Sequence, residues 1–481
     1  MPVFETNGVI VEDIILYNYR GTPVSLNDIT KEFVVYHDLM IQGIRCDIMI
    51  DDAKGLIEMA PIVGDENILL RFKSPNTEKL REYSFRVYKV GKRKKTNERS
   101  ESFVLQCCSH EIINNNRKSI NRSYIDQSGD NIIKGIYASF LEPQQNDFVF
   151  IRKKNLYLQQ TDGNHSFVFT GEKPLDCINY ICKESQAKIK GFINQYDYQK
   201  YKTPSNQVEF EDQNLSSNFV FYESYDGWYL NTFDYLMSQE PVNDFYLMKS
   251  DVENKKTIDQ QIKPYQIIIN IKQVKQVDTL ENINTGIYSH KVETIDPITK
   301  RFTTDIFSYD RDSKYITHLE KDKSLYAKNS LFGKDSNSSI TKYMISNIGE
   351  DYSNQSFLVK AKGKDPQIRN PRKLHKWFKY EYASRLQLNN IVLEVTIPGN
   401  TNIKIGDVIN IHMPQNTENK EYMKKDNLLY GNKFFVTALR HNINSVDQNF
   451  FTTLECIKDV YAKDIIEEEI KLTTSDFEGA E

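Results

Sequence analysis

The sequence predicts an α+β protein that is mainly β, with two similar antiparallel β-barrel domains, the second discontinuous, and inserted helical or mixed α+β layers. Two groups of short segments rich in β-branched and aromatic residues, one near each end of the chain, support this prediction. Segments with helical spacing separate them. No catalytic signature accompanies the strands, so the first inference is a shape that binds other proteins.

The first group predicts a β-barrel over residues 1–109. Its strand-like segments, joined by Asp, Gly, Asn and Pro turns, are Val9–Leu16, Phe33–Tyr36, Ile44–Ile50, Ile68–Phe72, Tyr83–Val90 and Ser102–Cys108. Pairing the last two places a basic run at a hairpin tip, where Lys92, Arg93, Lys94, Lys95 and Arg99 could contact nucleic acid or an acidic partner. The alternative is a solvated turn, because charges at loop tips keep strands soluble.

After Ser109 the apolar spacing becomes helical, which predicts an inserted helical or mixed domain over residues 110–217. Two helices are expected in His110–Ile120 and Asp130–Leu141, the second with one apolar face. A third should begin at Lys173-Pro174, because proline suits a first helical turn, and should run to Ala187.

The second barrel is expected in two pieces, residues 218–240 and 386–460. Asp226-Gly227 between aromatic segments predicts a hairpin in the first piece. The second piece contains the strand-like runs Val408–His412, Lys433–His441 and Asn449–Asp459.

An inserted mixed domain with polar loops is expected over residues 241–385. It contains a strand-like Tyr265–Ile271, a hairpin-like Tyr288–Tyr309 and a helical Lys373–Ala383. An acidic tail, residues 461–481, should be mobile or become ordered only against a partner, and Asp464, Glu467 and Glu468 are its candidate interface residues.

Composition excludes several classes of protein. A chain of 481 residues and 56.3 kDa is long enough for roughly three or four units. A mean hydropathy of -0.58 and no apolar run near membrane-spanning length predict no membrane insertion, and Met1–Thr6 resembles no secretory signal. A net charge of -4 argues against a dedicated nucleic-acid binder. The six cysteines lack zinc-ligand spacing and are expected to be buried free thiols.

The sequence contains no G-x-S-x-G, H-E-x-x-H or P-loop motif, so no catalytic, cofactor or metal site is expected. Arg440 and His441 should face opposite sides of a strand, and Asp51-Asp52 should be solvated. The aromatic residues of the predicted hairpin could stack on sugars, but alternation more simply places them in a core or at a subunit contact; they are Tyr222, Tyr225, Trp228 and Tyr229.

The order and spacing of several segments carry a resemblance. They are Ile50-Asp51-Asp52, Leu56-Ile57-Glu58, Phe85–Val90, Ser109-His110-Glu111, Lys173-Pro174-Leu175, Phe219–Trp228, Gly286-Ile287-Tyr288, Arg440-His441 and Leu454–Asp459. Together they resemble the baseplate hub protein of contractile-tailed phages of the T4 type, which is related to tail late-control proteins and type VI spike N-terminal regions. Residues 311–385 lie outside the resemblance and suggest a lineage-specific insertion.

The resemblance implies a homotrimeric ring in the virion baseplate, assembled in the host cytoplasm. Two barrels per chain would present six similar docking surfaces, adapting a hexameric tail tube to a trimeric central spike that can carry a lysozyme. Baseplate wedge proteins would be further partners, and DNA and the tape measure would pass through the lumen. A phage tail and a tail-derived injection device both fit. The alternatives are a multi-domain carbohydrate-binding β protein and an unrecognised cell-wall hydrolase.

Overall fold

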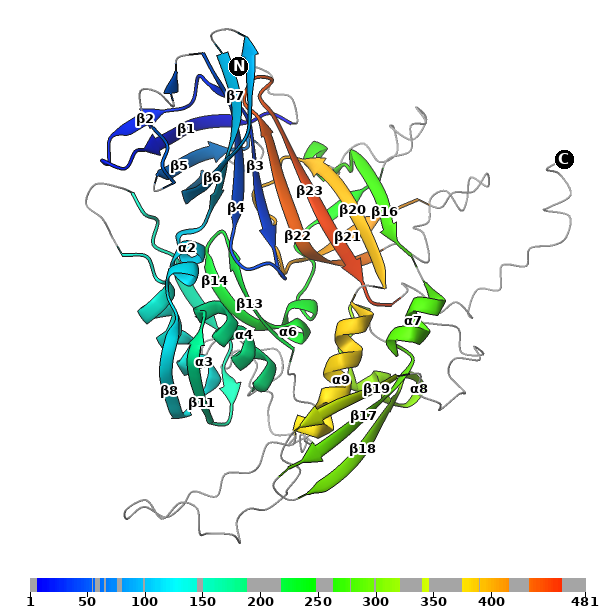
Figure 1. Cartoon of the computed structure of the whole chain (residues 1–481). Helices are drawn as coiled ribbons and strands as arrows, with labels where there is room; N and C mark the ends of the chain where they lie inside the picture. The colour runs from blue at the N-terminus through cyan, green and yellow to red at the C-terminus, as the bar shows by residue number, and fades with distance from the viewer. Residues whose placement is uncertain are drawn as a thin grey trace, which may run out of the picture.

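The computed structural model describes most of the chain and gives it a large β body with two smaller units beside it (Figure 1). The described residues are 7–53, 55–56, 61–64, 66–75, 80–97, 100–144, 150–187, 218–247, 263–276, 278–297, 300–320, 340–345, 374–388, 390–414 and 432–460. The candidate interface residues Arg99, Asp464, Glu467 and Glu468 lie outside them.

The first β unit contains every strand predicted before Ser109. Its strands are β1 (Ile10–Tyr17), β2 (Pro23–Ser25), β3 (Thr30–Asp38), β4 (Arg45–Asp52), β5 (Asn67–Lys73), β6 (Arg81–Asn97) and β7 (Ser100–Cys108). They pair antiparallel in the order β3-β4-β7-β6-β5-β1-β2. Alternating apolar residues on these strands point inward and form one core.

The second β unit has the same strand order. Its strands are β15 (Asp244–Tyr246), β16 (Asn270–Lys275), β20 (Ile391–Pro398), β21 (Val408–His412), β22 (Asn432–Asn444) and β23 (Asn449–Lys458). They follow the order β16-β20-β23-β22-β21-β15. Read in chain order, this matches β3-β4-β7-β6-β5-β1 strand for strand, although β15 is parallel to β21 whereas β1 is antiparallel to β5. The expectation of two similar β units is confirmed.

The two units are not separate sheets, because β3 pairs with β22 and joins them into one 13-stranded sheet. Blue and orange strands therefore lie side by side in Figure 1. The path through the described strands ends at β16 and β2 and does not close on itself. The mainly β, antiparallel character predicted from the sequence is confirmed.

The first insertion is the predicted helical and mixed layer, which lies below the sheet in Figure 1. Its elements are α2 (His110–Arg117), β8 (Ile120–Gln127), α3 (Gly129–Ile136), the π-helix η1 (Tyr137–Leu141), β9 (Asn155–Leu158), β10 (Thr161–Asp162), β11 (His165–Glu172), α4 (Pro174–Glu184) and β12 (Gln186–Ala187). The apolar face of Asp130–Leu141 is buried as predicted, and its last part is a π-helix.

The second insertion packs the helix α9 (Leu374–Gln387) against a three-stranded sheet. That sheet has the order β18-β17-β19, and its neighbours are short helices. The bounds are β17 (Ser289–Asp296), β18 (Arg301–Ser308), β19 (Ile340–Ile345), α7 (Thr279–Thr285), α8 (Tyr309–Asp312) and the 3-10 turn η5 (Ser313–Tyr315). The hairpin and helix predicted from the sequence are both present.

The strand predicted at Tyr265–Ile271 begins only at Asn270. Residues Pro264–Gln266 instead form a 3-10 turn, η4. The fixed φ of proline suits a helical turn, and the Gln266 side chain accepts a hydrogen bond from the Lys263 N–H at 3.0 Å. Local turn chemistry therefore overrides the apolar run.

The predicted hairpin around Asp226-Gly227 is present as β13 (Phe219–Ser224) and β14 (Gly227–Thr232), followed by α6 (Phe233–Met237). Its loop is Tyr225-Asp226, and Gly227 begins the second strand. The hairpin pairs with β9 of the first insertion rather than with a strand of the second β unit. All six cysteines are buried and free, as predicted.

Replacing Gly227 with alanine should destabilise the protein, because a Cβ atom there would lie 2.1 Å from the backbone oxygen of Asn155 on β9. We expect Gly227→Ala to lower the free energy of unfolding by about 2–3 kcal/mol, measured by urea denaturation. Gly135→Ala is the matched control, because nothing lies within 4 Å of its added Cβ and alanine favours the helix. Equal stability of the two variants would contradict this packing.

Candidate assembly interface

The β13–β14 hairpin contributes side chains to all three large cores of the protein. Phe221 and Trp228 stack at 5.0 Å inside the core of the first insertion. Tyr222 is buried in the core of the second β unit, and Tyr225 packs against the core of the first. One short hairpin therefore determines how the three units sit against one another.

This burial bears on the carbohydrate-binding alternative. Trp228 is fully buried and Tyr222 is 3% exposed, so neither ring can stack on a sugar at the surface. Tyr229 is half-buried between Tyr157 and Tyr222, with ring centroids 4.7 and 5.5 Å away. The hairpin aromatics form packing contacts, as the simpler interpretation of their alternation predicted.

The hairpin loop is held by charged residues of both β units. The Tyr225 ring lies between the guanidinium groups of Arg81 and Arg152, each 3.9 Å from its centroid. Asp226 forms an ion pair with Lys404, which precedes β21 of the second unit. A cation–π contact with a desolvated guanidinium group is worth about 2 kcal/mol, and Arg81 is 2% exposed, so this loop is strongly fixed.

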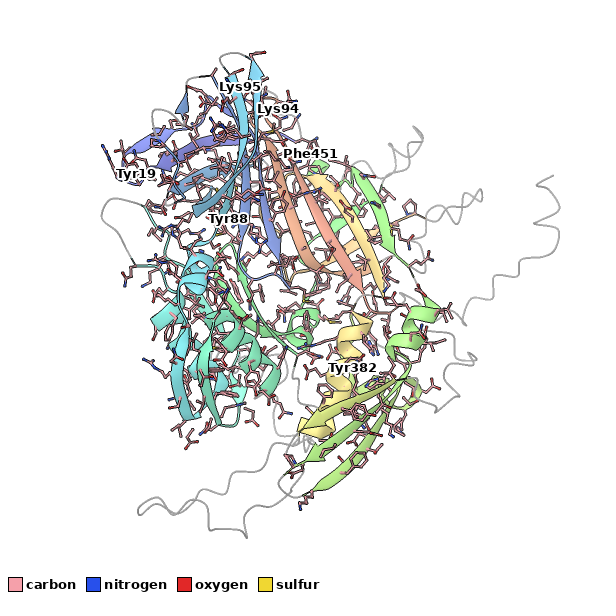
Figure 2. All side chains as sticks on the ribbon, in the orientation of Figure 1. Tyr19, Tyr88, Lys94, Lys95, Tyr382 and Phe451 are labelled. Atoms are coloured by element: carbon pink, nitrogen blue, oxygen red, sulfur yellow. The ribbon has the colours of Figure 1, made fainter. Side chains whose placement is uncertain are left out.

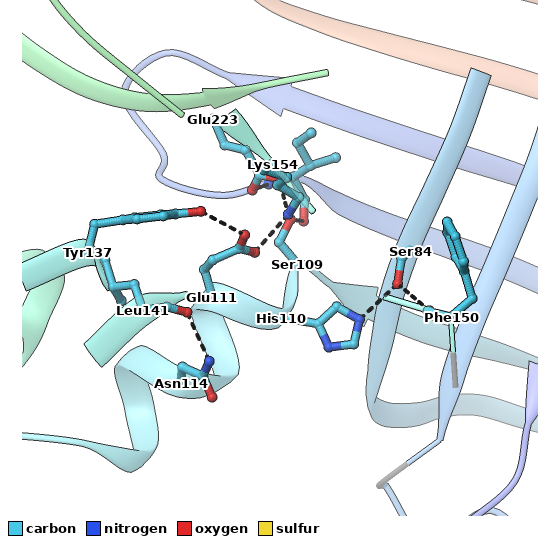
Figure 3. A network of polar contacts seen from close by, with 11 residues as sticks. Ser84, Ser109, His110, Glu111, Asn114, Tyr137, Leu141, Phe150, Lys154 and Glu223 are labelled. Carbon is cyan, nitrogen blue, oxygen red and sulfur yellow. Dashed lines mark hydrogen bonds and ion pairs between the residues drawn. The ribbon is translucent and has the colours of Figure 1, made fainter. Parts of the chain in front are cut away.

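A buried ion cluster lies where the hairpin meets the first insertion (Figure 3). The Lys154 ammonium lies 2.7 Å from Glu111 Oε2 and 2.5 Å from Glu223 Oε1, and both carboxylate side chains are 0% exposed. Glu223 also accepts a hydrogen bond from the Ile44 N–H at 2.9 Å, beside β4. The cluster links the first β unit, the first insertion and the hairpin.

The charges of this cluster depend on one another. Burial alone would lower the pKa of Lys154, but its two carboxylate partners raise it above its ordinary value. Burial raises the pKa of Glu223, and Lys154 offsets only part of that effect. In Glu111 the charge and hydrogen bond of Lys154 outweigh burial and lower the pKa. Lys154 is the common partner whose positive charge offsets the cost of burying two carboxylates.

A serine–histidine pair beside this cluster bears on the hydrolase alternative (Figure 3). Ser84 Oγ lies 3.0 Å from Nε2 of His110, and it also donates to the Phe150 carbonyl at 3.1 Å. Both side chains are 5% exposed, and burial lowers the pKa of His110 to about 4. A general base works best when its pKa lies near the operating pH, so this pair is poorly suited to activating a nucleophile.

The other charged candidates occupy structural positions. Asp51 forms an ion pair with Lys31 at 2.7 Å, and buried Asp52 accepts a hydrogen bond from the Leu56 N–H. The expectation that both are solvated is therefore wrong for Asp52, which closes the turn after β4. Among the described residues no group of His, Cys, Asp and Glu could hold a metal ion.

The basic run is exposed and occupies the outer part of the β6–β7 hairpin, with Lys94 and Lys95 close to its tip. β6 continues to Asn97, which lies opposite Ser100 of β7, so Lys92, Arg93, Lys94 and Lys95 lie along a two-stranded ribbon. Figure 2 shows Lys94 and Lys95 near its end. Register shifts in the pairing with β7 accommodate the extra residues. Arg93 forms an ion pair with Glu101 of β7 at 2.6 Å. We call residues 88–97 of β6 the basic ribbon.

The join between the two β units buries a histidine pair that sequence reasoning missed. His37 on β3 and His441 on β22 have ring centroids 5.9 Å apart. Burial, with the charge of nearby Arg81, lowers the pKa of His37 to about 3 and that of His441 well below its ordinary value. A signal was present in Phe33, Val35 and His37, whose alternation predicts that the histidine faces the core. Arg440 and His441 do face opposite sides, as predicted.

Comparison with solved structures shows which proteins share this fold. A tail protein from Neisseria meningitidis MC58 superposes with a TM-score of 0.51 at 10% identity, covering 95% of this chain and 99% of that one. The 43 kDa tail protein of prophage MuSo2 from Shewanella oneidensis gives a TM-score of 0.50 at 8% identity, covering 93% and 98%. The chain therefore has a fold shared with phage tail proteins, as the sequence resemblance predicted.

No protein family model and no curated protein matches the sequence. At identities near 10% the likeness lies in the fold alone. None of the helices in the described part of the chain combines the length and apolar character needed to cross a membrane.

Replacing Lys154 with methionine should strongly destabilise the protein, because it leaves two carboxylates buried without their cation. We expect a loss of about 3–5 kcal/mol in the free energy of unfolding, measured by urea denaturation. Lys153→Met is the control, since the neighbouring Lys153 side chain is 76% exposed and lies 3.9 Å from Glu142. Adding Glu111→Gln and Glu223→Gln to the Lys154 variant should restore part of the loss. If the two added substitutions restored no stability, the loss would come from the missing packing of the Lys154 side chain and not from unpaired buried charge.

The buried histidine pair should make the protein less stable in acid. Above about pH 6.5 His37 and His441 are neutral in both states and contribute nothing to the pH dependence. Below it the unfolded chain binds protons and the folded chain does not. The free energy of unfolding therefore falls by about 1.4 kcal/mol per pH unit for each histidine. His37→Asn should flatten the slope between pH 6 and 5 by that amount in urea titrations.

His318→Asn is the control for that measurement. Burial opposes the charged form of His318, but the hydrogen bond and charge of Asp459, 2.7 Å away, outweigh it and raise its pKa. Protonated His318 stabilises the folded state, so its removal cannot flatten the acid decline. An unchanged slope in His37→Asn would contradict the neutral buried pair.

Proposed function

We propose that this protein is the structural baseplate hub of a contractile tail, a trimeric ring that adapts a hexameric tail tube to a trimeric central spike. The observation that carries the proposal is the duplicated strand order within one chain, in a fold shared with phage tail proteins. Three chains with two equivalent units each offer six similar surfaces on one face, while the insertions follow threefold symmetry.

The rigid placement of the two units supports this role. An adaptor must hold six docking surfaces at fixed angles, and flexible linkage between units would blur them. Here the units share one sheet, and Ile443 and Phe450 of the second unit pack into the core of the first. The hairpin loop then binds both units through Tyr225 and Asp226.

The partners follow from this role. The tube-docking units would be residues 1–109 and the second β unit of β15, β16 and β20 to β23, with the insertions directed toward the spike and the wedge proteins. DNA and the tape measure would pass through the lumen of the assembled virion baseplate. The chain itself would be non-enzymatic, a role supported by the buried hairpin aromatics and the weakly basic His110.

The purified protein should form a particle of about three times the 56.3 kDa chain mass, measured by light scattering. Projections in electron microscopy should show a ring with a central hole and six lobes in two alternating kinds. Binding to immobilised glycans and activity on bacterial cell walls are the control measurements for the two alternatives. A monomer that persists in the presence of tube and spike proteins would contradict the hub proposal.

A further inference from the structure

The duplication allows the two β units to be aligned strand by strand. In the shared order β3 corresponds to β16, β4 to β20, β5 to β21, β6 to β22 and β7 to β23. This correspondence rests on hydrogen-bonded topology alone and requires no sequence similarity between the units.

A shared irregularity fixes the alignment to single residues. In the second unit the β22–β23 register shifts after Val436, which lies opposite Cys456. In the first unit the β6–β7 register shifts after Val87, which lies opposite Cys107. Bulges are specific features of a strand pair, so Val87 corresponds to Val436 and Cys107 to Cys456.

Only one of the two equivalent joints is made within the chain. The second half of β22, from Ala438 to Asn444, pairs antiparallel with β3 of the first unit. The corresponding half of β6 is the basic ribbon. Among the described strands, residues 88–97 of β6 pair with β7 alone. The counterpart of β3 is β16, which pairs with β20 alone among the described strands.

Exposed apolar side chains mark both of these open edges. Tyr88 and Val90 on the ribbon are 45% and 36% exposed, and Val274 on β16 is 57% exposed. Leu439, which corresponds to Val90, is 3% exposed and lies in the core of the second unit, at the place where β3 pairs with β22. Large apolar residues on unpaired strand edges are normally avoided, so their presence on both edges indicates that a strand covers each.

We propose that the basic ribbon of one copy pairs antiparallel with β16 of a second copy, reproducing between chains the β22–β3 joint within the chain. The inference rests on the trimer of the proposed function and names its contact. Because the ribbon and β16 differ, the contact is head-to-tail, and three copies related by rotation close a ring.

The internal joint predicts the register between copies. Asn442 on β22 lies opposite Val34 on β3. Because Cys107 corresponds to Cys456, Ser102 of β7 corresponds to Phe451 of β23. Lys94 lies opposite Ser102 and Asn442 lies opposite Phe451, so Lys94 corresponds to Asn442.

The position opposite Lys94 follows in the same way. Asp47 of β4 lies opposite Gln106 and Glu394 of β20 lies opposite Glu455, the residues that precede Cys107 and Cys456, so Asp47 corresponds to Glu394. Val34 of β3 lies opposite Asp47, and Lys272 of β16 lies opposite Glu394. Lys272 therefore corresponds to Val34, and Lys94 should face Lys272 of the neighbouring copy. Lys95 should face Ile271.

The charges at this contact make it weaker than the internal joint. Lys94 and Lys272 would lie directly opposite each other, and like charges in that position weaken a strand pair. Glu394, which lies beside Lys272 on the next strand, offsets only part of this repulsion. The internal joint buries Ile443, whereas its counterpart on the ribbon is Lys95. The contact between copies is therefore more polar than the internal joint.

Disulfide crosslinking tests this register in the full-length protein. The double variant Lys94→Cys with Lys272→Cys should give covalent dimers and trimers on non-reducing gels after mild oxidation. All six native cysteines are buried and free, so the unmodified protein is the background control. Lys94→Cys with Gln273→Cys is the matched control, because neighbouring strand residues point to opposite faces and should crosslink at least tenfold less.

The outcomes separate the two proposals. Crosslinked trimers in the first double variant alone support the pairing. A trimer by light scattering without any crosslink at 94 and 272, or with equal crosslinking in both double variants, would overturn the pairing and leave the hub intact. A protein that stays monomeric with its tube and spike partners would overturn the hub proposal itself.

Discussion

The pairing of β3 with β22 is the constraint on which the rest of the architecture depends. Seven successive residue pairs, from Ala438 opposite Asp38 to Asn444 opposite Glu32, join two units that would otherwise be separate. The joint has an apolar inner side, where Ile443 and Phe450 enter the neighbouring core. Rotating one unit against the other would break these hydrogen bonds and expose that side. The duplicated units therefore behave as one rigid body.

A second constraint sets where the inserted layer lies. The β13–β14 hairpin places Trp228 in one core and Tyr222 in another, so its position is fixed by apolar packing on both sides. The buried cluster of Lys154, Glu111 and Glu223 adds little net stability, because the cost of desolvating three charges is about as large as their mutual attraction. It instead specifies how the inserted layer is oriented. Only one arrangement brings both carboxylates to the ammonium. Packing provides the energy, and the ion cluster selects the orientation.

Local patterns predicted most elements of this fold, because alternation and turn residues act over a few positions. The hairpin at Asp226-Gly227 and the helix beginning at Pro174 follow from such signals. The strand predicted over Tyr265–Ile271 was wrong in its first part, because Pro264 begins a turn that the apolar character of the segment does not reveal. The candidate site was harder to predict, because His37 and His441 lie about 400 residues apart and meet only through the β3–β22 joint. The Lys154 cluster likewise brings together Glu111, Lys154 and Glu223, which lie far apart in the sequence and share no repeating pattern that could predict their contact.

The two copies of the β unit differ where their surroundings differ. The tip of β22–β23 carries Ile443 and Phe450, which are covered as soon as the chain folds and can be apolar. The corresponding positions on β6–β7 carry Lys95 and Glu101, and no described strand of the chain pairs with the outer edge of β6 at Lys95. An apolar tip on the ribbon would promote uncontrolled pairing between free chains, whereas a charged tip remains soluble until a partner edge in the correct register reaches it. Duplication supplies the geometry of a ring, and this divergence separates a permanent joint from one that forms on assembly.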